Sequence, residues 1–160
     1  MSDVKVAYTD VIPIACTLTS LAVGGARESD AVDNKTSTKY LDALVRLKTK
    51  TATGSVVTST IELYVWGSLD GTSFPDNCDG TNSGVTQVVP PNTEWLGRIC
   101  CPTASTAYVS NAFSVCKKLG VLALPPYWGV IVLNNSNTIL SATAGDHVLS
   151  YVGIYQTISA

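Results

Sequence analysis

Apolar and polar residues alternate along most of this chain. The clearest case is residues 41–51, where apolar side chains recur at every second position and charged side chains fall between them. Because successive side chains of a strand point to opposite faces, this segment predicts a strand with one buried and one solvated face. Residues 59–69 repeat the alternation after a short polar connection. We therefore expect these two strands to pair antiparallel.

Further strands are predicted along the rest of the chain. Residues 127–133, YWGVIVL, form a nearly continuous apolar run that is typical of a strand buried on both faces. Residues 70–84 are dense in turn formers and predict a long loop, and no segment shows convincing helical periodicity. Shorter strands are expected at 4–8, 86–89, 94–101, 106–115, 119–124 and 148–158, with an edge strand over 12–23 that carries Pro13 near its start. The pattern predicts an all-β, single-domain antiparallel β-sandwich that is jelly-roll-like.

The first twelve residues stand apart from this pattern. A chain of 160 residues is most simply one domain. We expect the sandwich to occupy residues 13–160 and residues 1–12 to form an extended N-terminal arm. Such an arm would become ordered on a neighbouring subunit; the alternative is a frayed terminus.

Composition and charge exclude several classes of function. The chain is only 14% charged and has a net charge of −2. Only Arg46, Lys48 and Lys50 line up, and strand alternation explains them as a solvated face, so the clustered cations needed to bind nucleic acid are lacking. No apolar run approaches the roughly 20 residues that span a bilayer, and the first residues do not read as a secretory leader. We expect no nucleic-acid or membrane partner and synthesis in a cytoplasm.

The five cysteines do not form a metal or disulfide pattern. Their number is odd and no Cys-x-x-Cys spacing occurs. We expect most of them to be small buried apolar residues, with a disulfide formed after release from the cell as the alternative. They are Cys16, Cys78, Cys100, Cys101 and Cys116.

The sequence offers little catalytic chemistry. A nucleophile–histidine pair would have to use His147, the only histidine, which opens the last predicted strand. Asp70, Asp76 and Asp79 lie close in sequence but do not match a calcium-binding loop, and their turn-forming neighbours explain them without an ion. The three glutamates show no sign of facing each other. We expect no enzyme activity, no catalytic residue, no metal and no cofactor.

Two groups of residues are candidate contact surfaces. The first is the charged segment before residue 41, in a chain that is otherwise poor in charge; the alternative is a solvated loop. The second is an aromatic surface formed by Tyr64 and Trp66, on which sugar rings could stack; the alternative is that both side chains fill the core. The residues of the charged segment are Arg27, Glu28, Asp30, Asp33 and Lys35.

The order of short motifs resembles a family of small tailed-bacteriophage virion proteins. In these proteins a loop of the form A-R-x-S-x-x-V-D-N precedes a Tyr-Leu-Asp strand. The matching residues here are Ala26, Arg27, Ser29, Val32, Asp33 and Asn34, followed by Tyr40, Leu41 and Asp42. The resemblance continues through residues 61–76, 112–115, 124–136 and 141–156, and it covers most of the chain from about residue 18.

This resemblance implies a structural role in a virus particle. The role expected first is a capsid decoration (cement) protein, which binds the outer shell, contacts the major capsid protein and stabilises contacts between capsomers. The alternatives are a tail or neck component, or a glycan-binding module on the virion surface. The protein would be assembled into virions in the host cytoplasm. Because capsid contacts lie on symmetry axes, we expect a homo-oligomer, and a trimer in particular.

Overall fold

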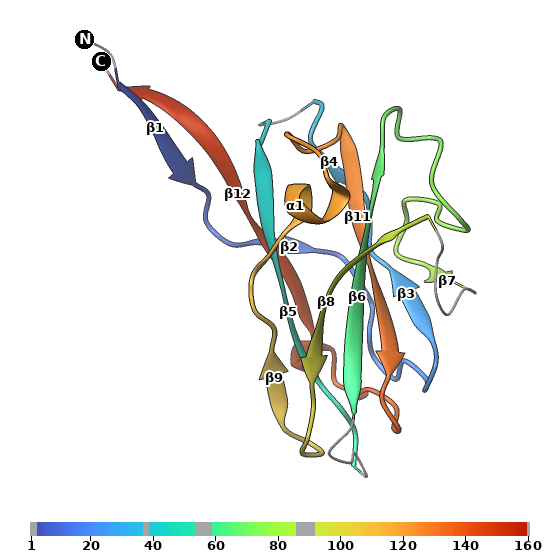
Figure 1. Cartoon of the computed structure of the whole chain (residues 1–160). Helices are drawn as coiled ribbons and strands as arrows, with labels where there is room; N and C mark the ends of the chain where they lie inside the picture. The colour runs from blue at the N-terminus through green and yellow to red at the C-terminus, as the bar shows by residue number, and fades with distance from the viewer. Residues whose placement is uncertain (1–2, 37–38, 54–58, 86–91, 160) are drawn as a thin grey trace.

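The regular secondary structure of the protein is almost entirely β-strand, arranged in two antiparallel sheets that pack face to face (Figure 1). The computed structural model describes residues 3–36, 39–53, 59–85 and 92–159. This arrangement confirms the prediction of an all-β antiparallel sandwich.

The first sheet, sheet A, is built around the last strand of the chain. Strand β12 lies between β5 on one side and β1 and β2 on the other, and β5 also pairs with β9 and β10. The strands of sheet A are β1 (Asp3–Tyr8), β2 (Ile12–Ile14), β5 (Asp42–Lys50), β9 (Ala107–Val109), β10 (Phe113–Ser114) and β12 (Val148–Ser159).

The second sheet, sheet B, is built around the apolar run near residue 130. Strand β11 pairs with β6 over its whole length, and on its other edge it pairs with β3 and β4. Strands β7 and β8 form the outer edges. The strands are β3 (Ala26–Glu28), β4 (Val32–Asp33), β6 (Thr60–Ser68), β7 (Gly84–Val85), β8 (Glu94–Cys100) and β11 (Tyr127–Asn135).

The connectivity is that of a jelly roll. In each sheet a late strand lies between two early ones: β12 between β2 and β5, and β11 between β3 and β6. The chain crosses between the sheets from β2 to β3, from β5 to β6 and from β11 to β12, while β6 and β8 are neighbours in sheet B, as in the double Greek keys of this fold. Two short helices, α1 (Val115–Leu119) and the 3-10 turn η1 (Ala144–Asp146), complete the described structure.

The main core lies between the two sheets and is made by the alternating residues of the long strands. Strand β5 contributes Ala43, Val45 and Leu47, and β6 contributes Ile61, Leu63 and Val65, all of which are fully buried. This confirms the prediction of which face of each strand is buried. Burying apolar side chains of this size contributes about 1.5–3 kcal/mol each, which makes this cluster the main source of stability.

A smaller apolar cluster lies on the other face of sheet B. Here Tyr64, Trp66, Ile131 and Leu133 are covered by the loop over residues 70–84, through Cys78 and the half-buried Phe74. Strand β11 is consequently buried on both faces, as its continuous apolar run predicts. The long loop is therefore a packed outer layer of the sandwich.

Several predictions about pairing and boundaries were wrong. Residues 41–51 and 59–69 do not pair with each other, because β5 belongs to sheet A and β6 to sheet B. The edge strand expected over 12–23 is limited to β2, and the strand expected over 106–115 is divided into β9, β10 and the first residue of α1. Residues 119–124 are not a strand. The strand expected at 86–89 lies outside the described residues.

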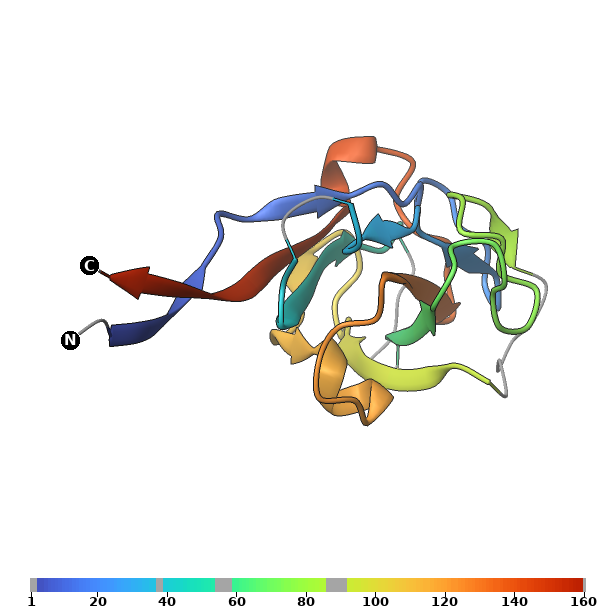
Figure 2. The ribbon, with the colours of Figure 1, turned by 90° about the horizontal axis from the view of Figure 1, so that it is seen from above.

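Both ends of the chain leave the sandwich together. Strand β1 pairs with the last residues of β12, from Asp3 opposite Ser159 to Tyr8 opposite Ile154. These two segments form a two-stranded ribbon that projects from the body (Figures 1 and 2). The segment expected to order on a neighbour is thus paired here with the end of its own chain.

Candidate functional site

The charged segment that contains Arg27 packs against the covering loop of sheet B. The Arg27 guanidinium donates from Nε to Asn82 Oδ1 at 3.0 Å and from Nη2 to the Asn82 carbonyl at 2.7 Å. Asn82 in turn accepts a hydrogen bond from the Thr17 amide at 2.8 Å, and its own amide donates to Asp30 at 2.7 Å. The half-buried Arg27 and the exposed Asp30 therefore hold the end of the loop in place.

Glu28 is the innermost residue of this segment and is completely buried. Its two carboxylate oxygens accept hydrogen bonds from the backbone amides of Asp79 and Gly80, each at 3.0 Å. Burial raises the pKa of this carboxyl, and the two amide hydrogen bonds partly offset the rise. The expectation that Glu28 contacts another subunit was wrong, because this side chain is an internal anchor of the loop.

Asp33 and Lys35 lie in the turn that follows β4. Asp33 is half-buried and accepts hydrogen bonds from the amides of Lys35, at 2.7 Å, and Thr36, at 3.0 Å, as well as from the Thr36 hydroxyl. These hydrogen bonds, with the Thr36 hydroxyl first among them, lower the pKa of Asp33. Lys35 is exposed. Within the charged segment, Asp30 and Lys35 are the exposed residues of the five, so the segment is mainly a folding element.

The expected aromatic surface is not exposed. Trp66 is 1% exposed and Tyr64 is 7% exposed, because the covering loop lies over both. The Trp66 ring meets Phe74 edge-on at 5.2 Å between centroids, and the Tyr64 hydroxyl donates to Glu62 at 2.8 Å. The prediction of a glycan-stacking surface at these residues was therefore wrong. The alternative prediction, that both side chains fill the interior, is correct.

The motif residues that carry the phage resemblance have structural roles. Ser29 Oγ accepts from the Val130 amide at 3.0 Å, and the Asn34 side chain closes a loop by bonding both the amide and the carbonyl of Tyr40. Asp42 accepts from the Ser114 hydroxyl at 2.6 Å and from the Cys116 amide at 3.0 Å. The motif therefore specifies loop closures and links between strands.

His147 has a structural environment. One ring nitrogen lies 2.9 Å from Thr49 Oγ1 and the other lies 2.9 Å from the Ser141 carbonyl. Its neighbour Asp146 forms an ion pair with Lys50 at 3.2 Å and accepts from the Ser141 hydroxyl at 2.6 Å. Both ring nitrogens are thus occupied by partners that fix the start of β12.

The three aspartates considered for calcium each accept hydrogen bonds within the protein. Asp70 and Asp79 accept from amides two or three residues further on, and Asp76 accepts from the amide and side chain of Asn92. The contacts of Asp70 and Asp79 are the ordinary chemistry of Asx turns, whereas Asp76 joins two separate segments of the chain. In the part of the chain that the structure describes, no group of three His, Cys, Asp or Glu residues could hold a metal ion.

The loop carboxylates predict a loss of stability in acid. Hydrogen bonds from the Thr72 and Ser73 amides hold the pKa of Asp70 far below its usual range. A carboxyl whose pKa is lowered in the folded state stabilises that state at pH values above its unfolded pKa of about 3.9. This stabilisation is lost as the pH falls toward the folded pKa. We expect the melting temperature to fall between pH 5 and pH 2, and to fall less in Asp70→Asn. Thermal unfolding at both pH values is the measurement, and equal losses in the two proteins would contradict it.

The raised pKa of Glu28 has the opposite effect on the pH dependence of stability. Its contribution grows as the pH falls, so it opposes the acid effect of Asp70. The lowered pKa values of Asp79 and Asp146 act in the same direction as that of Asp70. Asp70→Asn therefore removes part of the acid sensitivity and leaves the rest.

Cys16, Cys78, Cys100 and Cys116 are free thiols. Cys100 is exposed and its neighbour Cys101 is buried, because successive side chains of a strand face opposite ways. Burial raises the pKa of the Cys16, Cys78 and Cys116 thiols to about 12 and that of Cys101 to about 11. Since the thiolate is the reactive form, the raised pKa values keep these four thiols protonated at neutral pH.

An exposed apolar strip runs along the ribbon and onto sheet A. In an antiparallel pair, residues directly opposite each other share a face. Val4 lies opposite Ile158, Tyr8 opposite Ile154, and Val152 opposite Leu44, so all six share the outer face of sheet A. The exposed fractions are 64% for Val4, 61% for Val6, 60% for Tyr8 and 75% for Ile158. The apolar strip consists of Val4, Val6, Tyr8, Val11, Leu44, Val152, Ile154 and Ile158, interrupted by Gln156 opposite Val6.

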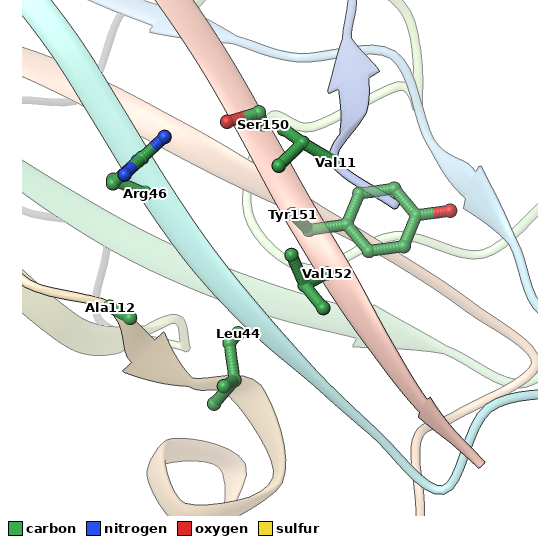
Figure 3. A pocket seen from close by; sticks show the side chains of 7 residues that line it. All are labelled: Val11, Leu44, Arg46, Ala112, Ser150, Tyr151 and Val152. Atoms are coloured by element: carbon green, nitrogen blue, oxygen red, sulfur yellow. The ribbon is translucent and has the colours of Figure 1, made fainter. Parts of the chain in front are cut away.

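The body end of the strip is slightly hollowed (Figure 3). Val11, Leu44, Ala112 and Val152 line a depression of about 170 Å³, with Arg46 at its side. This volume is smaller than the roughly 300–1,000 Å³ of small-molecule sites. The depression therefore suits a protein side chain better than a metabolite.

The strip was missed in the sequence because its residues are far apart along the chain. Val4, Val6 and Tyr8 did show weak alternation, and alternation within 148–158 was recognised. Only their antiparallel pairing places both sets on one face. The two-residue period of both segments was the available signal, but the sequence does not indicate that the ends of the chain meet.

No described helix has the length and apolar character required to cross a membrane. No protein-family model matches the chain, and comparisons with curated proteins and with solved structures find no significant match.

Proposed function

We propose that this chain is a structural protein of a bacteriophage particle, and specifically a decoration (cement) protein on the outer shell of the capsid. The ordered series of motifs that resembles small virion proteins of tailed phages carries this proposal. Its partners are the major capsid protein and further copies of itself. Its place is the capsid surface, after assembly in the host cytoplasm.

The properties of the molecule support a binding role without catalysis. The jelly roll is a fold of viral capsid domains, although it also serves lectins and enzymes, so it supports the proposal only as an analogy. The apolar strip is a stronger argument, because a contiguous exposed apolar patch on a protein surface is typical of a contact with another protein or a membrane. The histidine and the buried carboxylate both have structural partners, and the proposal assigns neither a catalytic role.

Immunogold labelling of intact phage particles tests the proposed location. We expect label over the entire head, because a cement protein occupies repeated positions on the capsid lattice. Label confined to one vertex or to the tail would overturn the cement role and favour the tail or neck alternative. Pre-immune serum on the same particles is the control.

Binding to purified heads tests the proposed contact. Heads that lack the protein should bind it at saturation in a fixed ratio to the capsid protein, measured by co-sedimentation. Leu44→Asp places a charge inside the apolar strip, whereas Lys35→Asp changes an exposed charge outside it, so Leu44→Asp should weaken binding more than Lys35→Asp. Equal binding by both variants and the wild type would remove the strip from the contact.

A further inference from the structure

The free edge of strand β1 has the properties of a self-pairing surface. Strand β1 is the outermost strand of sheet A and its one strand neighbour among the described residues is β12. The ribbon that it forms with the end of β12 has only two strands and leaves the body (Figure 2). Because a two-stranded ribbon is marginally stable by itself and an open edge is a template for another strand, this ribbon needs a further partner.

The direction of the backbone groups along β1 follows from one hydrogen bond. The Thr9 amide donates to the Gly153 carbonyl at 3.0 Å, and the Gly153 amide donates to the Thr9 hydroxyl at 2.9 Å, so the Thr9 N–H faces β12. The register of β1 on β12 is continuous with this pair. Since inward and outward directions alternate along an antiparallel strand, Val4, Val6 and Tyr8 direct their N–H and C=O groups away from β12. The same residues carry the apolar side chains of the strip.

We propose that β1 pairs antiparallel with β1 of a second copy of this chain, about a two-fold axis at Val6. Val6 then lies opposite the second copy's Val6, and Val4 lies opposite its Tyr8. The two ribbons join into one sheet in the order β12-β1-β1-β12. This proposal goes beyond the virion role and does not depend on it.

Charge and overlap favour this register over axes at Lys5 and at Val4. An axis at Lys5 would place two ammonium groups directly opposite each other, which is destabilising. An axis at Val4 would leave Val6 and Tyr8 without outward-facing partners in the described part of β1. An axis at Val6 pairs every outward-facing residue with another and places Lys5 opposite Ala7. The sequence of β1 therefore complements itself, which is the requirement of an isologous contact.

The side chains gain from the same register. Val6 against Val6 and Val4 against Tyr8 are β-branched and aromatic pairs, which are among the favourable cross-strand combinations. Both copies keep their apolar strip on the same face of the joined sheet, because a two-fold axis perpendicular to the sheet preserves the face. The contact forms dimers, and it does not by itself form the trimer expected from the sequence.

Proline at position 6 tests the backbone part of the contact. Val6→Pro removes an N–H that points away from β12, so the ribbon within one copy is expected to persist. Because the contact is symmetric, the variant loses two intersubunit hydrogen bonds, one from the position-6 N–H of each copy. Each lost bond is expected to weaken the dimer about tenfold. We expect the dimer dissociation constant to rise by about 100-fold in sedimentation equilibrium. Val6→Thr, which keeps the N–H and the β-branched shape, is the matched control and should remain dimeric.

Cysteine cross-linking tests the register. In a background in which the exposed Cys100 is replaced by serine, Val6→Cys should form a disulfide-linked dimer under mild oxidation, because opposite Cα atoms lie within the range of a disulfide. Lys5→Cys should not link to itself. A mixture of Val4→Cys and Tyr8→Cys should link more than either variant alone.

The outcomes separate the proposal from its alternatives. A wild-type protein that is monomeric at high micromolar concentration overturns the proposal. In that case the alternative is that the free edge of β1 pairs with a strand of a different protein. A dimer that is unaffected by Val6→Pro also overturns it, since the contact must lie elsewhere. Self-linking of Lys5→Cys in place of Val6→Cys rejects the register.

Discussion

Glu28→Ala is expected to lower the free energy of unfolding by about 2–4 kcal/mol, and the melting temperature by roughly 5–15 °C. The carboxylate accepts the amides of Asp79 and Gly80 at 3.0 Å each, and alanine leaves both donors without this partner. Hydrogen bonds to a charged group contribute about 1.5–3 kcal/mol each, but the cost of burying the carboxylate offsets part of this. Thermal and denaturant unfolding give the size of the loss.

The loop itself gives a second and more specific measurement. We expect amide hydrogen exchange in residues 78–82 to accelerate more than in β11, because Glu28 anchors the loop directly. Glu28→Gln is the matched control: it keeps one acceptor oxygen and removes the buried charge, so its loss should be about 1 kcal/mol. If Gln and Ala variants lose equal stability, the hydrogen bonds to the loop are not what Glu28 contributes.

Gly129→Ala is expected to cost about 3 kcal/mol, at the upper end of the effects of overpacking. Gly129 lies opposite Trp66 on neighbouring strands, and a Cβ at this position would lie 2.3 Å from Cζ2 of the indole. Trp66 has no free space to move into, because Phe74 covers it from the loop side. The variant therefore has to displace either the ring or the loop. Urea unfolding reports the loss of stability. Intrinsic fluorescence, to which Trp95 and Trp128 also contribute, reports a change around Trp66.

Two further variants distinguish this clash from a general intolerance of alanine. Gly145→Ala meets no atom within 4 Å and should change stability by less than about 1 kcal/mol. Trp66→Phe removes the part of the ring that clashes, so combining it with Gly129→Ala should cost less than the sum of the single changes. Additive costs in this double-mutant cycle would show that the indole is not the obstacle.

Sequence periodicity was sufficient for the strands and their buried faces. The alternation within β5 and β6 placed Val45, Leu47, Leu63 and Val65 inside, and all four are fully buried. The continuous apolar run of β11 correctly indicated burial on both faces. These predictions succeeded because the period of a strand is a local property of the backbone, so that an apolar face must be buried wherever the strand lies.

The candidate sites were predicted less well, for a physical reason. Composition identified Glu28, Tyr64 and Trp66 as conspicuous residues, but a conspicuous residue in a loop or strand is exposed or buried according to what covers it. The covering element is the segment 70–84, which the sequence presents as an ordinary polar loop. Its few apolar residues, Phe74 and Cys78, complete a second cluster only because the fold lays them on sheet B.

The sequence by itself determined the class of the fold, the buried faces of the long strands and the scarcity of catalytic groups, because each of these depends on residue type and spacing. Only the tertiary structure decided which strands pair, what covers Trp66, and that the two ends of the chain form one ribbon. Those features depend on contacts between segments as far apart as Val4 and Ile158. Such contacts are selected by the competition among all possible pairings in the folded chain, which no local pattern encodes.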